Sequence, residues 1–555
     1  MGSLQTLDYI VFFFYFIVVA SYGTWIYWRK KNDAASSTDY FLAEGSLTWW
    51  AIGASLIASN ISAEQFIGMS GDGFEMGLGI STYEWMAAAT LLVVGIFFMP
   101  IYLKNKIFTM PQFLNNRYNS TVSTIMAIFW LFLYVFVNLT AILYLGALAV
   151  STISGLDFNM CMYGLAIFAI IITLGGMKVI GYTDVIQVLF LIIGGLATTY
   201  MAVSLVSKNY GMEGISEGVG LMQSKASDHF HMIFNKDSPH YMRMPGLAVL
   251  IGGMWIVNLN YWGCNQYITQ RALGADLETS RKGILFAAFL KMLMPIIVVV
   301  PGIAAYVLHQ KGMFQQEMLK DGVLNKDNAY PVLLNLLSPG LKGLSFAALT
   351  AAIVASLAGK ANSISTIFTL DIYRKFFGKD ASEAQLVLIG RLTVVVAILI
   401  AIFASPYMGI DKKGGFQFIQ EMTGLVSPGL FAAFFMGFFW KKTNSEGALF
   451  AIVGGFLMAV LMNFDQRVEA WDDMGRIASQ TSNIFPFLEW GRMPFIDRMG
   501  AIFCICVAVM IALGLWKPSD KGLDVDSSMF RMDRGFAIGA GVIVAMLTAL
   551  YTYFW

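Results

Sequence analysis

The chain has 555 residues, of which 57% are hydrophobic and only 13% are charged, and its formal net charge is +1. Soluble domains carry about a quarter charged residues, so this composition, with a mean hydropathy of +0.66, excludes an ordinary soluble protein. The near balance of charges also excludes a disordered acidic or basic chain and a nucleic-acid binder that depends on a basic surface. The sequence therefore predicts a polytopic membrane protein.

Apolar stretches recur along the whole chain. A transmembrane helix needs about 20 mostly apolar residues, and fourteen stretches meet this requirement. The first carries Asp8 near its start and lacks the basic flank and the cleavage site of a signal peptide. We therefore predict fourteen membrane-spanning helices, within a few residues at each edge, at 7–28, 49–71, 78–102, 122–153, 157–176, 182–206, 246–268, 281–308, 341–373, 386–407, 414–439, 445–464, 497–516 and 535–555.

The positions of lysine and arginine predict the orientation in the membrane. Short cytoplasmic loops carry more of these residues than outer loops do. Here they follow the odd-numbered spans, as at 29–31, 104–117, 374–379 and 517–534, whereas one short loop on the opposite side, at 412–413, is basic. We therefore expect a multi-pass protein of the cell membrane with both termini on the outer side.

Sequence motifs narrow the class of membrane protein. The phosphate-binding pattern G-x-x-x-x-G-K-[ST] is absent from the sequence, which excludes a primary pump. The pattern H-E-x-x-H is absent too, so we expect neither an intramembrane enzyme nor a cofactor. The four cysteines are too scattered for a disulfide framework or a zinc site. A secondary transporter or a channel remains, or a sensor that has kept a transporter fold.

Two predicted spans turn polar at mid-depth, at residues 54–65 of the second span and 258–266 of the seventh. Polar groups in hydrocarbon are costly unless they serve a function, and unwound helices expose backbone groups to substrate and ion. We expect both helices to be broken, which favours a transporter; kinked helices packed through small residues are the alternative. The second and seventh spans are five apart, as the first helices of two inverted five-helix repeats would be.

Ionisable and amide side chains inside other spans predict a binding pocket. Glu84 lies one or two turns inside the third span, and Lys291 lies about 15 Å inside the eighth. Asp184 opens the sixth span, and Gln420 and Glu421 lie early in the eleventh. Membranes tolerate such groups when they pair or face an aqueous cavity. With nearby aromatic rings they suit a neutral polyhydroxylated ligand; a structural ion pair, an amino-acid site and a nucleobase site stay open.

Several motifs together resemble the sodium/solute symporter family, and in particular its sodium–glucose cotransporter branch. The resemblance runs essentially end to end. It implies an all-α membrane protein of the leucine-transporter type, with an inverted repeat of five plus five helices, that works by alternating access. The motifs lie at 60–68 (NISAEQFIG), 83–85 (YEW), 175–176 (GG), 183–187 (TDVIQ), 258–263 (NLNYWG), 362–373 (NSISTIFTLDIY) and 417–429 (QFIQEMTGLVSPG).

The resemblance also implies a division of the chain and a function. Residues 1–48 form an extra helix and the first cytoplasmic loop, 49–206 the first repeat, 207–245 an extracellular loop, 246–440 the second repeat, and 441–555 the C-terminal helices. The function implied is a symporter that couples inward sodium movement to hexose uptake. Its expected partners are a sugar, sodium and the lipid bilayer, without nucleic acid.

In this family, polar side chains bind the sugar hydroxyls, a tyrosine under the sugar forms the inner gate, and apolar residues form an outer lid. A neighbouring serine of the family is Ala87 here. We therefore expect glucose or galactose as substrate, with myo-inositol or another polyol as alternatives. The matching residues are Gln65, Glu84, Asn258, Lys291 and Gln420 for the sugar, Asn60 as a further contact, Tyr261 and Trp262 at the inner gate, and Met69, Tyr83 and Phe416 at the lid.

The implied sodium site departs from the family pattern. Its expected ligands are the backbone carbonyls of Ala58, Ile61 and Ala352 and the hydroxyl of Ser356. The family has a second serine where this chain has Ala355. Because sodium prefers oxygen ligands, as other hard cations do, the loss of this hydroxyl is expected to weaken the site. A second sodium site is not expected.

A lysine near the implied sodium site is a further departure. Lys360 replaces an apolar residue one helical turn from Ser356 and shares its helix face. In one interpretation, its ammonium replaces part of the sodium charge, with Asp184 as its partner. The alternative is that Lys360 extends toward the inner vestibule and leaves the sodium site intact. A replaced sodium charge would make the chain a sodium-independent or proton-influenced sugar transporter.

Overall fold

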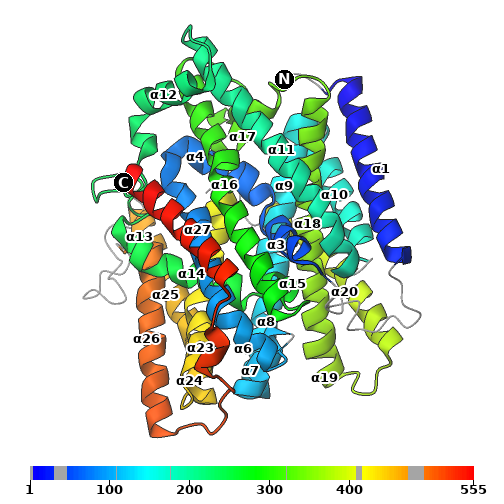
Figure 1. The fold of residues 1–555 in the computed structure, drawn as a ribbon, viewed down its shortest axis with the longest axis vertical. Coiled ribbons are helices and arrows are strands. Elements are labelled where there is room, and N and C mark those ends of the chain that lie inside the picture. The colour runs from blue at the N-terminus through cyan, green and yellow to red at the C-terminus, as the bar shows by residue number, and fades with distance from the viewer. Residues whose placement is uncertain are drawn as a thin grey trace.

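The computed structural model describes residues 4–29, 47–107, 109–174, 177–320, 322–407, 415–472 and 493–555. This part of the chain is almost entirely helical, and its strands are the two-residue antiparallel pair β1 (Leu319–Lys320) and β2 (Val323–Leu324). The helices run mostly along the long axis of the molecule (Figure 1). The predicted all-α fold is therefore confirmed.

Short 3-10 or π-helical turns, labelled η, interrupt several of the long helices. The N-terminal half contains α1 (Thr6–Arg29), α3 (Trp49–Asn60), η2 (Glu64–Met69), α4 (Ser70–Met76), η3 (Gly77–Ser81), α5 (Thr82–Val93), η4 (Val94–Phe98), α6 (Met99–Lys104), α7 (Met110–Arg117), α8 (Ser120–Phe132), η5 (Leu133–Leu139), α9 (Thr140–Ser154), α10 (Phe158–Thr173), α11 (Met177–Asn209), α12 (Ile215–Lys225), η6 (Ser227–Phe230), α13 (Leu247–Ile251), α14 (Gly253–Cys264) and α15 (Gln266–Ala272). The C-terminal half contains α16 (Leu277–Gln310), η7 (Lys326–Asn328), α17 (Ala329–Leu334), α18 (Leu341–Ile367), η8 (Phe368–Tyr373), α19 (Arg374–Phe376), α20 (Glu383–Ala404), η9 (Ser405–Tyr407), α22 (Gly415–Gly424), α23 (Ser427–Phe439), α24 (Ser445–Leu449), η10 (Phe450–Gly454), α25 (Gly455–Asp472), α26 (Phe495–Trp516), η12 (Ser527–Phe530) and α27 (Arg534–Tyr553).

Fewer helices qualify as membrane spans than the sequence predicts. In the described residues, nine helices are long and apolar enough to cross a membrane, or ten if α22 and α23, bent by 53°, form one span. Two shorter apolar helices, Thr6–Val19 and Phe158–Thr173, lie within predicted spans. The breaks explain part of the difference, because α3 has only 12 residues before its helix is interrupted. The count of fourteen and the five-plus-five repeat stay predictions.

The predicted break in the second span is present. Helix α3 ends at Asn60, and Ile61 is extended (φ −82°, ψ 118°) before the helix resumes at η2. The sequence Ser-Ala-Glu-Gln restarts it: the side chain of Gln65 accepts from the backbone N–H of Ser62 at 3.0 Å, and the Ser62 hydroxyl accepts from the N–H of Glu64 at 3.2 Å. This resembles a capping box, except that the Ser62 hydroxyl accepts from the second residue after it instead of the third, so local sequence fixes where the polar segment turns.

The predicted break in the seventh span is also present. Helix α14 ends at Cys264, Asn265 is extended (φ −99°, ψ 122°), and α15 starts at Gln266. The Asn265 carbonyl accepts the N–H of Thr269 at 3.0 Å, which starts the new helix. The two breaks therefore place helix ends with free backbone groups in the interior of the bundle. Unwound helices of transporters use this feature.

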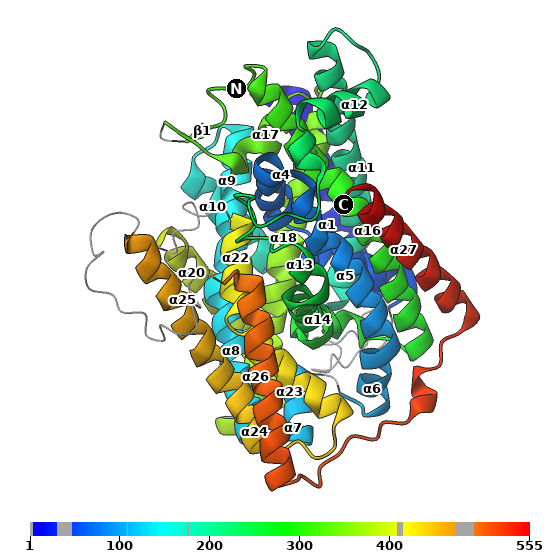
Figure 2. The ribbon, with the colours of Figure 1, turned by 90° about the vertical axis from the view of Figure 1, so that its left-hand side faces the viewer.

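Two long helices form the centre of the bundle. Helix α16 packs against α3, α4, α5 and α11, and α18 packs against α1, α11 and α20. Their glycines permit close approach: a Cβ at Gly302 would lie 2.1 Å from the Ser70 backbone oxygen. Figure 2 shows α25 and α26 on one side of this bundle and α27 on the other. The broken segments are thus held against rigid central helices.

The contact of α16 with α4 leads to a prediction about the thermal stability of the protein. Gly302→Ala forces two helix backbones apart, and overpacking of this kind costs about 1–3 kcal/mol or more. We expect a clearly lowered melting temperature for the purified protein, read by fluorescence-detected size exclusion after heating. The matched control is Gly164→Ala in α10, where an added Cβ meets nothing within 4 Å. Equal melting temperatures for both variants would contradict the backbone contact.

The outer helices present apolar faces suited to lipid. On α10, Met160, Tyr163, Ile167 and Ile171 are each at least half exposed and recur at helical spacing. Both chain ends lie in the upper half of Figure 1. The C-terminal carbonyl of Trp555 contacts the His231 ring at 2.9 Å, within the long segment between α12 and α13. The placement of both termini outside the cell remains a prediction.

Candidate functional site

A cavity lies between the broken helix α3–η2 and the helices α5, α14, α16 and α22. The volume of the cavity is about 50 Å³, which is room for a few water molecules and less than the usual range for small-molecule sites. All six residues predicted to contact the substrate line it, from six different elements: Asn60, Gln65, Glu84, Asn258, Lys291 and Gln420. Tyr83, Tyr261, Trp262 and Phe416 line it as well, whereas Met69 is buried outside it.

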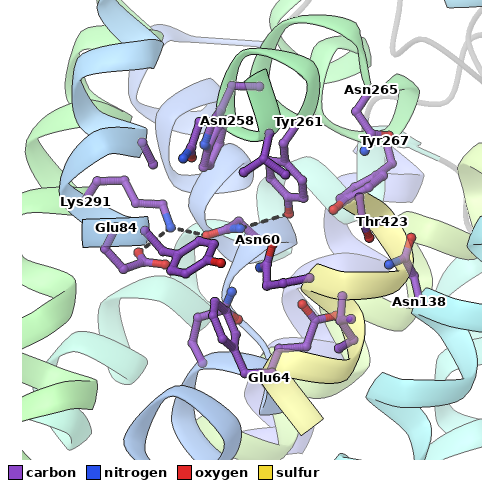
Figure 3. Close-up of a pocket in the computed structure, with 18 residues that line it drawn as sticks. Asn60, Glu64, Glu84, Asn138, Asn258, Tyr261, Asn265, Tyr267, Lys291 and Thr423 are labelled. Atoms are coloured by element: carbon purple, nitrogen blue, oxygen red, sulfur yellow. Dashed lines mark hydrogen bonds and ion pairs between the residues drawn. The ribbon is translucent and has the colours of Figure 1, made fainter. Parts of the chain in front are cut away.

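A chain of polar contacts crosses the cavity. The Lys291 ammonium donates to the Glu84 carboxylate and to the side-chain oxygen of Asn60. The Asn60 amide then donates to the hydroxyl of Tyr261 at 2.9 Å (Figure 3). The side chains of Lys291 and Glu84 are only 1% and 4% exposed, and the ammonium also lies 5.2 Å from the centre of the Trp262 ring. The structural ion pair that the sequence left open is therefore formed, and it is part of the cavity wall.

Two of the amides are held in place by backbone groups. Gln65 uses its carbonyl oxygen to accept from Ser62, and Asn258 donates to the carbonyl of Met254 at 3.1 Å. Each amide keeps its other polar group for a ligand in the cavity, since an amide has both donor and acceptor ends. The side chains are therefore oriented before any ligand binds, which reduces the entropy lost on binding.

The aromatic pair Tyr83 and Phe416 separates this cavity from a smaller one above it. Their rings meet edge to face with centroids 5.1 Å apart, and both residues, with Gln420, line both cavities. The smaller cavity is lined by Asp72 and Arg243 as well. The two rings thus lie between the two cavities, and their role as an outer lid stays a prediction.

A cluster of four charges lies beyond the aromatic pair. Arg243 contacts Asp72 and Glu75 at 2.6 Å each, and Lys326 contacts the same two carboxylates. Asp72 and Glu75 belong to α4, whereas Arg243 precedes α13 and Lys326 begins η7. These ion pairs tie three segments together, so the route from this side to the main cavity is closed in the structure.

Tyr261, the residue predicted to form the inner gate, lies beside the cavity in an aromatic group. Its ring meets Trp262 at 5.2 Å and Tyr267 at 5.7 Å, in both cases edge to face. Tyr267 belongs to α15, beyond the break at Asn265, so the aromatic group spans the broken helix. The hydrogen bond from Asn60 joins this group to the other broken helix. Tyr261 therefore connects both interruptions beside the cavity.

The residues of the implied sodium site meet where the end of α3 packs on α18. Ala58 is in the last turn of α3, Ile61 follows it, and Ala352 and Ser356 are one turn apart on α18. The Ser356 hydroxyl donates to the backbone carbonyl of Ser59 at 3.2 Å, which joins the two helices. Ala355, which stands where the family has a second serine, is buried as well. The structure therefore places Ser356 against the last turn of α3, and the sodium ligands Ala58, Ile61, Ala352 and Ser356 stay a prediction.

The predicted partner of Lys360 is wrong. Lys360 lies 3.3 Å from the Glu64 carboxylate and 3.3 Å from the Ser356 hydroxyl, whereas Asp184 accepts from Ser55 at 2.6 Å and lies 3.9 Å from Arg271. Arg271 enters from α15 and is fully buried, although the sequence placed it in a loop. Arg271 pairs with Asp184, so Glu64 is the carboxylate that pairs with Lys360. The extended alternative for Lys360 is wrong as well, because this side chain is only 1% exposed.

Sequence reasoning missed several lining residues. Glu64 is an ionisable residue inside the predicted second span, so the rule that selected Glu84 and Lys291 should have selected it. Asn265 lies in the polar run of the seventh span, and Asn138 is an amide in an otherwise apolar span. Tyr267 and Thr423 gave no such signal. The missed polar or aromatic lining residues are Glu64, Asn138, Asn265, Tyr267 and Thr423.

Comparison with known proteins identifies the family to which this chain is similar. A family model described as "Sodium:solute symporter family" matches residues 40–455. The "Sodium/glucose cotransporter" of Vibrio parahaemolyticus is 45% identical over 100% of this chain and 99% of its own length. The human "Sodium/myo-inositol cotransporter 2" is 34% identical over 83% of this chain and 70% of its own length.

A solved structure supports the fold. The structure of a Na⁺-coupled sialic acid symporter aligns with a TM-score of 0.73 at 22% identity and covers 93% of this chain and 99% of that one. At this identity the likeness concerns the fold alone. The family match and the full-length relative show that this chain belongs to the Sodium:solute symporter family: it is a multi-pass membrane transporter that moves a solute together with sodium, and it is not an enzyme.

Proposed function

We propose that this symporter carries a neutral hexose, glucose or galactose, into the cell by alternating access and that inward sodium movement drives it. The observation that supports this most strongly is the convergence of six predicted polar residues from six elements on one cavity. Hexose hydroxyls both donate and accept hydrogen bonds, and the cavity offers amides, a carboxylate and an ammonium. Trp262 and Tyr261 add ring faces suited to the C–H faces of a sugar.

The charges of the cavity favour a neutral solute. The two full charges nearest the centre, on Lys291 and Glu84, pair with each other. A third, on Glu64, pairs with Lys360. A carboxylate-bearing or zwitterionic solute would have to break one of these pairs, and breaking a buried pair leaves an uncompensated charge. A solute with hydroxyls and no charge can instead share their hydrogen bonds.

A cyclic polyol is the second candidate. Ala87 lines the cavity beside Glu84 and removes one hydroxyl contact, and among the relatives is a sodium/myo-inositol cotransporter. A competition experiment separates the candidates: unlabelled glucose, galactose, myo-inositol and sialic acid are titrated against labelled galactose bound to the purified protein. We expect glucose and galactose to displace the label and sialic acid not to. Displacement by myo-inositol alone, or no galactose binding at all, would contradict a hexose substrate.

Alternating access needs a barrier on each side of the substrate. Tyr83 and Phe416, beneath the charge cluster of Asp72, Glu75, Arg243 and Lys326, supply the outer barrier. The aromatic group around Tyr261 supplies the inner one. Tyr261 belongs to the broken helix α14–α15, and Tyr83 and Phe416 belong to helices beside the broken helix α3–η2. Movement at the breaks can therefore open the barrier on one side of the substrate while the other barrier stays closed.

The amides of Gln65 and Gln420 give a first test of the site. Each substitution to Ala removes a hydrogen-bonding partner, which typically costs about 1–3 kcal/mol. We expect hexose affinity to fall roughly tenfold or more in Gln420→Ala, and at least as far in Gln65→Ala, which also loses the contact to Ser62.

Gln417→Ala is the matched control for these variants. Gln417 is on the same helix as Gln420, donates to Glu421 at 2.8 Å and lines the smaller outer cavity instead. Equilibrium binding of labelled hexose to the three variants gives the comparison. Unchanged affinity in both Gln65→Ala and Gln420→Ala would place the sugar elsewhere.

A further inference from the structure

Helix α18 carries a buried lysine at the implied sodium site. The Lys360 ammonium lies 3.3 Å from the Ser356 hydroxyl, one turn earlier on the same helix, and 3.3 Å from the Glu64 carboxylate on η2. The Tyr267 ring is 5.0 Å away. The side chains of Lys360 and Glu64 are 1% and 7% exposed. A cation of the protein itself therefore occupies the neighbourhood of the one side-chain oxygen expected to bind sodium.

The Ser356 hydroxyl is already shared. It donates to the carbonyl of Ser59 in the last turn of α3 and accepts from Lys360. Sodium bound there would need the same hydroxyl oxygen and would lie within a few ångströms of the ammonium. Two positive charges at that separation repel strongly in a poorly solvated interior. Sodium and the ammonium therefore exclude each other at this oxygen.

The buried charges around this junction already balance without sodium. Arg271 lies 3.9 Å from Asp184, and Lys360 lies 3.3 Å from Glu64. Arg271 also reaches α18 near Lys360, since a Cβ at Gly359 would lie 2.6 Å from its guanidinium. In the described part of this junction, two cations thus face two carboxylates. An added sodium ion would leave one uncompensated positive charge, which a buried site tolerates poorly.

We propose that Lys360 is a built-in competitor of the transported sodium ion, and that Glu64 is the counter-charge that holds the ammonium when sodium takes the Ser356 hydroxyl. This inference rests on the proposed function, because it deepens the account of the same ion site. Glu64 also lines the sugar cavity. One carboxylate therefore contacts both the competing cation and the space for the sugar, and it links the two sites that coupling must connect.

The test is equilibrium binding of radioactive sodium to the purified protein in detergent, without sugar. Lys360→Met removes the competing charge and nearly keeps the side-chain volume. We expect it to bind sodium about tenfold or more tightly than the wild type, since repulsion between adjacent buried charges is large. The matched control is Lys342→Met, on the same helix but about 27 Å away at 1.5 Å per residue, which should bind sodium as the wild type does.

A second variant guards against misfolding. Lys360→Met leaves Glu64 without its partner, so the double variant Lys360→Met with Glu64→Gln removes both charges, and size exclusion confirms that each protein is folded. Tighter sodium binding in either folded variant supports the competitor. Unchanged sodium affinity in both, or no sodium binding by any of the proteins, overturns it. Hexose binding is measured separately: if it is absent while Lys360→Met still tightens sodium binding, the proposed substrate fails and the competitor stands.

Discussion

We expect Lys291→Met to abolish hexose binding and to lower the stability of the protein. The ammonium contacts both Glu84 and Asn60 and is almost fully buried. Its removal leaves a buried carboxylate without a counter-charge, a change that typically costs about 3–5 kcal/mol. It also removes the donor that we propose for the sugar, and the contact between Lys291 and the side chain of Asn60. Thermal unfolding of the purified variant and equilibrium hexose binding measure the two effects.

A double-mutant cycle separates pairing from sugar contact. Lys291→Met combined with Glu84→Gln removes both charges, so stability should recover toward that of the wild type while hexose binding stays lost. Glu84→Gln alone should be destabilised because it leaves the ammonium unpaired. If the double variant is as unstable as Lys291→Met, the broken ion pair between Lys291 and Glu84 is not the cause of the lost stability. If Lys291→Met binds hexose normally, the cavity is not the sugar site.

Tyr261→Ala abolishes coupled accumulation, whereas Tyr261→Phe leaves part of it. The ring lies among Trp262 and Tyr267, and the hydroxyl accepts from Asn60 at 2.9 Å. Phenylalanine keeps the barrier of the ring and loses one hydrogen bond, which is worth about 1 kcal/mol. Alanine removes the barrier, so sugar that enters can leak back. The measurement is the steady-state sugar ratio in energised proteoliposomes.

Trp85→Phe is a control for the loss of an aromatic hydrogen bond elsewhere. Trp85 donates to the carbonyl of Met292 at 3.3 Å and does not line the main cavity. Its variant should accumulate sugar nearly as the wild type does. An alanine variant of Tyr261 with wild-type accumulation would show that this tyrosine is an ordinary packed residue.

The sequence predicted the broken helices and the polar cavity well, for one physical reason. Polar groups in hydrocarbon are costly, so the runs at 54–65 and 258–266 had to mark interruptions, and the structure has them at Ile61 and Asn265. The same cost selected Glu84 and Lys291, which the structure brings into contact. The resemblance to the family assigned sugar contacts to Gln65, Asn258 and Gln420, which the polar positions inside the spans had marked without giving them a role.

The partner of Lys360 could not be read from the sequence. Spacing along α18 correctly placed Lys360 next to Ser356, because residues four apart share a helix face. Spacing says nothing about which neighbouring helix supplies the counter-charge. That choice depends on Arg271, which looked like a loop cation and is instead buried against Asp184. Once Arg271 is placed, Glu64 is the carboxylate left for Lys360.

The central claim is that sodium entry drives hexose uptake. In proteoliposomes, one sodium ion that crosses about 100 mV supplies about 2.3 kcal/mol, and a tenfold sodium gradient adds about 1.4 kcal/mol. One-to-one coupling therefore supports accumulation on the order of several hundredfold. The measurement is the internal-to-external ratio of labelled galactose and glucose with the sodium gradient and membrane potential imposed and then collapsed. We expect accumulation far above unity that falls to equality when the gradient and the potential are collapsed; a ratio that only reaches equality under both conditions would contradict the account.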